Sequence, residues 1–86
     1  MSHYQIEFLK TARKELSKLP KDIQQRIALK IEALRENPYP PDSKKLKNGD
    51  GRLRIRVGDY RIIYSLEDEK LVVLVIKIGH RRNIYQ

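Results

Sequence analysis

The sequence contains no cysteine and no long apolar run. Without cysteine there is no disulfide framework and no thiolate zinc site, and the two histidines lack neighbours at ligand spacing, so we expect no metal and no cofactor. No stretch reaches the roughly 18 consecutive apolar residues of a membrane span, and the first residues lack a signal peptide's basic and apolar run. We therefore expect a cytoplasmic protein without membrane contact.

Acidic residues are few: 11 Asp and Glu stand against 19 Lys and Arg, which gives a formal net charge of +8. Such an excess favours polyanionic partners such as nucleic acid, although charge alone does not choose among them. A chain of 86 residues is long enough for one small hydrophobic core. We expect a single domain, residues 1–86, with its function on the surface of that core.

Hydrophobic periodicity in the first half predicts one strand and two helices. Residues 4–8 alternate between apolar and polar, as in a strand with one buried face. From Leu9 to Leu19 apolar residues recur every three or four positions, which predicts a helix. Pro20 separates it from a second helix, which we expect to end near Glu36, before a linker-like stretch at residues 37–51.

The second half is typical of three strands. Residues 52–57 and 60–66 should form an antiparallel hairpin around a Gly58-Asp59 turn. Residues 71–76 are continuously apolar, as in an inner strand, and Gly79 interrupts the pattern. Chain reversals would then bring the first strand antiparallel to the last. We expect an α+β domain in the order β-α-α-β-β-β, with a helical hairpin packed on one face of a four-stranded antiparallel sheet.

The register of the hairpin would gather arginines on one face. If Gly58 and Asp59 are the whole turn, Arg56 lies directly opposite Arg61. The other pairs are Arg54 with Ile63 and Arg52 with Ser65. All four guanidiniums would face away from the helices, and like charges placed directly opposite each other cost roughly 0.2–1 kcal/mol. Guanidinium binds phosphate through paired donors, so the pattern favours phosphate recognition over the alternative of an ordinary solvated face.

The C-terminal segment combines His80, Arg81, Arg82 and Tyr85. Cleavage of RNA by its own 2′-hydroxyl requires a base, donors for the negative charge that develops on phosphate, and an acid for the leaving oxygen. An imidazole, guanidiniums and a phenol can supply these parts. His80 could instead be an ordinary surface residue and Tyr85 a cap of the core. Their position just past the strand beside the arginine hairpin favours a joint catalytic role.

Four segments resemble the RelE/ParE superfamily of bacterial and archaeal toxins. They are Leu19-Pro20-Lys21, Lys45-Leu46, Leu53 to Tyr64 and Gly79 to Tyr85. The resemblance covers nearly the whole chain and implies the toxin of a toxin–antitoxin pair. It also implies a cognate antitoxin, usually acidic where it contacts the toxin. RelE-like members enter the ribosomal A site and cleave the messenger there by 2′-hydroxyl attack, so ribosomal RNA and messenger RNA are further implied partners.

The resemblance also implies roles for individual residues. Arg54 and Arg56 match two basic strand positions, Arg61 a phosphate-binding arginine, Arg81 a general acid or charge stabiliser, and Tyr85 a terminal tyrosine. His80 matches more loosely a catalytic histidine of several relatives. We therefore expect catalysis from Arg61, His80, Arg81 and Tyr85, and phosphate binding from Arg52, Arg54, Arg56, Arg82 and Lys45.

This chain departs from the family pattern in two places. The best-known members have lysines where this chain has Arg54 and Arg56. Since guanidinium hardly deprotonates, we expect these two side chains to bind phosphate and not to abstract a proton. Only Gln86 follows Tyr85. We therefore expect no extra C-terminal helix of the kind that some members carry, and an antitoxin that covers the site directly.

Two other functions stay open. A ParE-like toxin shares the fold but poisons DNA gyrase without RNA chemistry, and that branch typically lacks this combination of basic residues and tyrosine. A plain RNA-binding module would depend on its arginines and not on His80 or Tyr85. Mapping whether messenger RNA or DNA is broken would separate the first of these from the nuclease.

Overall fold

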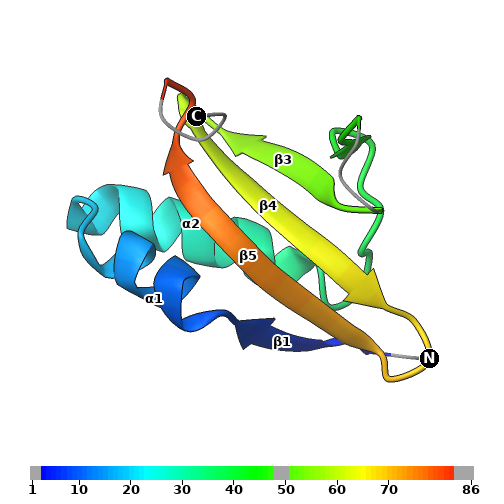
Figure 1. Cartoon of the computed structure of the whole chain (residues 1–86). Helices are drawn as coiled ribbons and strands as arrows, with labels where there is room; N and C mark the ends of the chain where they lie inside the picture. Colours follow the sequence, from blue (N-terminus) through cyan, green and yellow to red (C-terminus); the bar gives the residue numbers. More distant parts are fainter. Residues whose placement is uncertain (1–2, 48–50, 83–86) are drawn as a thin grey trace.

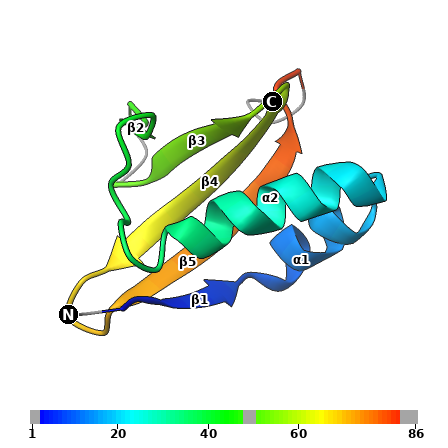
Figure 2. The ribbon, with the colours of Figure 1, turned by 180° about the vertical axis from the view of Figure 1, so that it is seen from behind.

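Two helices cover one face of a five-stranded sheet in the computed structural model, which describes residues 3–47 and 51–82 (Figures 1 and 2). The elements are β1 (Gln5–Phe8), α1 (Lys10–Ser17), α2 (Lys21–Ala33), β2 (Lys44–Lys45), β3 (Leu53–Val57), β4 (Tyr60–Glu67) and β5 (Val72–His80). Across the sheet the strands lie in the order β1-β5-β4-β3-β2. The predicted α+β class is confirmed, and β2 is an additional short strand inside the stretch predicted as a linker.

The prediction of a four-stranded antiparallel sheet is wrong in two respects. β2 adds a fifth strand at the edge, and β1 runs parallel to β5, with Gln5 beside Val72. The prediction assumed that the chain reverses at every connection. This assumption gives the wrong direction for β1, because only Leu9 separates β1 from α1 and the chain does not turn back there. In both views α1 continues in the direction of β1, and α2 then returns along the sheet (Figures 1 and 2).

Two predicted element ends also differ from the structure. α2 ends at Ala33, and the expected extension to Glu36 is a turn. β5 continues through Gly79 to His80, so Gly79 does not interrupt the strand. Glycine weakens a strand but can still adopt an extended backbone. The prediction therefore ended this strand too early.

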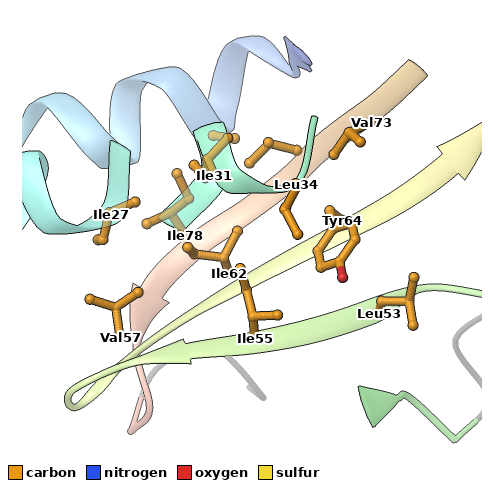
Figure 3. Close-up of a cluster of buried hydrophobic side chains, with 12 residues drawn as sticks. Ile27, Ile31, Leu34, Leu53, Ile55, Val57, Ile62, Tyr64, Val73 and Ile78 are labelled. Carbon is orange, nitrogen blue, oxygen red and sulfur yellow. The ribbon is translucent and has the colours of Figure 1, made fainter. Parts of the chain in front are cut away.

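The core lies between α2 and the sheet (Figure 3). Ile27, Ile31 and Leu34 recur at helical spacing and point at the sheet. Alternate residues of the strands meet them, namely Leu53, Ile55, Val57, Ile62, Tyr64, Val73, Val75 and Ile78. Because strand side chains alternate, the residues between these point to the other face of the sheet. The described residues include no helix long and apolar enough to cross a membrane.

Tyr64 ties the chain that follows α2 to the sheet. Its side chain is fully buried (0% exposed), and its hydroxyl donates a 2.9 Å hydrogen bond to the carbonyl oxygen of Pro38. Burial raises the pKa of Tyr64 from its ordinary value of 10.0 to about 12, because the phenolate would lose its hydration. The hydroxyl therefore stays protonated and keeps this hydrogen bond across the neutral range.

We predict that Tyr64→Phe lowers the free energy of unfolding by about 1 kcal/mol at pH 7, because the Pro38 carbonyl loses its donor. The raised pKa also makes the wild type sensitive to alkali. The stability that the protonated phenol contributes is fully present below the unfolded pKa of 10.0 and is lost as the pH rises through about 12. Tyr64→Phe should lack this alkaline component. Urea unfolding at pH 7 and at several alkaline pH values measures both effects.

Tyr39→Phe is the matched control, because Tyr39 is 53% exposed. It should unfold like the wild type at pH 7. Equal stability of the two variants at pH 7 would contradict the assigned role of the Tyr64 hydroxyl.

Candidate nucleic-acid interface

The hairpin of β3 and β4 closes through a two-residue turn, as predicted. Gly58 has a φ of 59°, a left-handed conformation that glycine adopts without strain, and Val57 pairs with Tyr60 across the turn. Arg56 consequently pairs with Arg61, and Arg54 with Ile63. The predicted register of these pairs is confirmed.

These arginines lie on the sheet face turned away from the helices, which we call the open face. Arg54, Arg56 and Arg61 alternate along their strands with core residues, so their side chains point away from α2. The Cα atoms of a directly opposed pair such as Arg56 and Arg61 lie about 5 Å apart. Within the described residues, no carboxylate forms a salt bridge with Arg56. The open face therefore concentrates positive charge over β3 and β4.

Arg52 does not join this ladder. The pairing of β3 with β4 ends at Leu53 and Tyr64, so Arg52 and its predicted partner Ser65 do not pair. Arg52 precedes β3, and its carbonyl accepts a 3.0 Å hydrogen bond from the backbone N–H of Leu46. The predicted pairing of Arg52 with Ser65 is wrong because β3 begins only at Leu53, and Arg52 belongs to the connection from β2.

A β-bulge in β5 decides which of its residues reach the open face. Tyr64 pairs with Val75 and Ile63 with Lys77, so the register skips Ile76. Before the bulge, Val73 and Val75 belong to the core; beyond it, Ile78 does. An extra residue in one strand re-aims every side chain that follows. Lys77 and Gly79 therefore lie on the open face.

The bulge completes a row of residues that crosses the sheet. Lys44 of β2 pairs with Arg54, Arg54 with Ile63, and Ile63 with Lys77. Sequence reasoning missed Lys44 and Lys77, because neither β2 nor the bulge has a recognisable local signal. Lys45, the predicted phosphate ligand, pairs with Leu53 and so falls on the helix side of the sheet.

The chain after β5 folds toward the arginine hairpin. The backbone N–H of Arg81 donates a 2.9 Å hydrogen bond to the carbonyl oxygen of Asp59, in the turn. Arg81 and Arg82 are both exposed. Arg81 is thereby held at the end of the sheet that carries Arg56 and Arg61, as the prediction of a joint site requires. Tyr85 lies outside the described residues, and its role stays a prediction.

His80 faces the helix side of the sheet. It pairs with Tyr60, which packs against the core, and the two rings meet edge to face with centroids 5.5 Å apart. Its Nδ1 accepts a 3.2 Å hydrogen bond from the backbone N–H of Arg82, so the neutral ring carries its proton on Nε2. The structure thus places the imidazole beside the backbone of residues 80–82 and not among the guanidiniums of the open face.

Comparison with known proteins identifies several similar toxins. The family model of the ParE toxin of the type II toxin–antitoxin system parDE matches residues 6–85. The mRNA interferase toxin RelE of Escherichia coli strain K12 is 32% identical over 79 residues, which cover 91% of this chain and 83% of that protein.

Solved toxin–antitoxin complexes have the same fold. In the archaeal RelE–RelB complex from Pyrococcus horikoshii, the similar chain has a TM-score of 0.82 at 30% identity, with 94% of this chain and 98% of that one covered. In the RelBE2 complex from Mycobacterium tuberculosis, the similar chain has a TM-score of 0.81 at 31% identity, with 92% of this chain and 99% of that one covered.

The opposed arginines lead to a prediction about stability. Arg56→Gln should raise the free energy of unfolding by up to roughly 1 kcal/mol in low salt, because it removes one of two like charges that face each other. High salt screens the repulsion and should shrink the gain. Urea unfolding at two ionic strengths measures it. Arg52→Gln, a substitution outside the ladder, should leave stability nearly unchanged. Destabilisation by Arg56→Gln in low salt would contradict the repulsion.

Proposed function

The chain belongs to the RelE/ParE superfamily of type II toxins, and we propose that it stops translation by cleaving messenger RNA in the ribosomal A site. One observation carries this proposal: the register sets Arg56 opposite Arg61 on the open face, with Arg81 held at the same end of the sheet. The name mRNA interferase that its RelE relative carries supports RNA cleavage over the gyrase-poisoning alternative.

The proposed reaction needs no covalent bond to the protein. The 2′-hydroxyl gives its proton to Tyr85 and attacks the neighbouring phosphorus, the bond to the 5′-oxygen breaks, and that oxygen takes a proton from Arg81 or from water. Arg61 stabilises the negative charge that builds on the phosphate, and Arg81 stabilises or protonates the leaving oxygen. Guanidinium is a poor base, so Tyr85 is the group we assign to proton transfer.

Phosphates on either side of the scissile bond would bind to the other cations. The proposed ligands are Arg52, Arg54, Arg56, Arg82 and Lys45. Arg54 and Arg56 lie on the open face itself, whereas Lys45 is at the edge of the sheet and adds to the attraction at longer range. So small a set of contacts relies on the ribosome to orient the messenger, which makes free RNA a poor substrate.

We assign His80 a positioning role. Its Nδ1 is occupied by the Arg82 N–H, and its ring rests against Tyr60. Both contacts hold the short segment in which Arg81 lies. His80 thus acts on the reaction by placing the Arg81 guanidinium, since its ring lies with Tyr60 on the helix side of the sheet, away from the open face.

The proposed partner that silences the toxin is an antitoxin. The similar chains from P. horikoshii and M. tuberculosis were solved in complexes with their antitoxins. The formal charge of +8 suits a partner that is acidic where it covers the arginines. Toxin and antitoxin would meet in the cytoplasm, where the ribosomes are.

We predict that Arg61→Ala and Arg81→Ala each lower messenger cleavage roughly 100- to 1,000-fold, because each removes a donor to the developing charge. Primer extension on a messenger translated with purified ribosomes should show wild-type cuts at codon boundaries, and none without ribosomes. Arg13→Ala is the matched control: Arg13 lies in α1, 5.6 Å over the Phe8 ring, so this change removes an equal charge from the helix layer. It should cleave like the wild type.

Two further variants separate the alternatives. Tyr85→Phe should remove cleavage without loss of RNA affinity, and His80→Ala should lower it while His80→Asn, which keeps an acceptor for the Arg82 N–H, restores part of it. Full translation inhibition by both Tyr85→Phe and His80→Ala would favour a plain RNA-binding module. Broken DNA with intact messenger after expression would favour gyrase.

A further inference from the structure

Gly79 has no explanation within the fold. It lies in β5 with extended backbone, so it does not use the positive φ that only glycine tolerates. A Cβ added at this position would meet no atom of the described residues within 4 Å. Glycine inside a strand weakens it, and where no bulge or turn requires it, another molecule often approaches the backbone closely. The bulge of β5 lies at Ile76 and does not involve Gly79.

The position of Gly79 shows what could approach. It pairs with Arg61, which pairs in turn with Arg56, so one row crosses three strands on the open face and ends in bare backbone. A side chain here would share the open face with Arg61, its partner in β4. At Gly79 the row has no side chain. This leaves a gap on β5 next to Arg61, the residue that we propose to stabilise the scissile phosphate.

Lys77 borders the same gap. It is two residues before Gly79 on β5, about 7 Å along the strand, and its side chain lies on the same face. Within residues 3–47 and 51–82, no carboxylate forms a salt bridge with Lys77. Glu15, whose carboxylate reaches this part of β5, accepts the N–H of Ile78 instead. An ammonium group is therefore available beside the gap.

The open face also contains a covered apolar residue, Ile63, between two of its basic side chains. It is only 6% exposed although it points away from the core, and its row neighbours are Arg54 and Lys77. The long stems of such side chains lie along apolar surface and keep their charged ends in water. Charged ends on both sides of Ile63 can thus bind successive phosphates of one strand.

We infer that the messenger crosses β5 at Gly79, where its backbone lies against bare strand backbone, and that Lys77 binds the phosphate flanking the cleaved one. The inference rests on the proposed function and adds the route of the substrate to it. The bulge at Ile76 is what makes the route possible, because without it Lys77 and Gly79 would point into the helix side.

Gly79→Ala tests the close approach. It should unfold at the same urea concentration as the wild type or a higher one, since its Cβ meets nothing and alanine suits a strand better. Its kcat/KM for messenger cleavage on ribosomes should fall roughly 10- to 100-fold, because the substrate is displaced by the methyl group. Gly79→Val should lower it further.

Lys77→Gln tests the phosphate contact. Its affinity for a messenger-bound ribosome should fall, and the slope of log affinity against log salt should decrease by about 0.7, the value for one contact to a single strand. Affinity for ribosomes with an empty A site should not change, which distinguishes messenger from ribosomal RNA. Lys70→Gln is the matched control, because Lys70 lies in the turn before β5 with its side chain 78% exposed.

The failures are distinguishable. A wild type that cuts no messenger would remove the proposed function itself. Only the route would be overturned if the wild type cleaves messenger and two further results hold. These are a wild-type kcat/KM for Gly79→Ala, and the same affinity for messenger-bound ribosomes in Lys77→Gln as in Lys70→Gln. A lower urea midpoint for Gly79→Ala would also overturn it, because the fold would then need the glycine. If Lys77→Gln lowered the affinity for ribosomes with an empty A site as much as for messenger-bound ribosomes, Lys77 would contact ribosomal RNA. That result would reject the route.

Discussion

The two-residue turn at Gly58-Asp59 is the constraint on which the rest of this structure depends. Side chains alternate between the faces of a strand, so the length of the turn sets the face of every residue in both strands. With Val57 opposite Tyr60, the apolar residues of β3 and β4 meet α2 and the arginines point away from it. A slip of one residue would bury the guanidiniums under the helices. The same strand register therefore closes the core and exposes the charged surface.

The charged surface is tolerated because the core stabilises it. Directly opposed arginines such as Arg56 and Arg61 repel, but the burial of Ile55 and Ile62 in the same strands is worth about 1.5–3 kcal/mol for each side chain, more than the repulsion costs. The hydrophobic face thus holds the cations closer together than they would settle alone. In the proposed function, phosphate binding would relieve this repulsion, which is a physical reason to expect affinity for a polyanion.

The strand order brings distant parts of the chain to this surface. β5 comes last but lies between β1 and β4, so it carries the end of the chain to the turn, where the Arg81 N–H reaches the Asp59 carbonyl. The bulge at Ile76 then assigns its neighbours to faces: Lys77 and Gly79 to the open face, His80 to the helix side with Tyr60. This placement is the reason why we propose a positioning role for His80, which the sequence alone predicted to be catalytic.

The sequence by itself determined the local features: the helices, the hairpin, its register, and hence the gathering of Arg54, Arg56 and Arg61. Periodicity and turn chemistry act over a few residues, so they can be recognised without a structure. Only the tertiary structure decided the direction of β1, the pairing of β2, and the faces of Lys77 and His80. Directions depend on how the chain connects layers, and a bulge in an apolar run leaves no pattern, since both faces of that strand are largely covered. Contacts between segments far apart in the chain settle such choices.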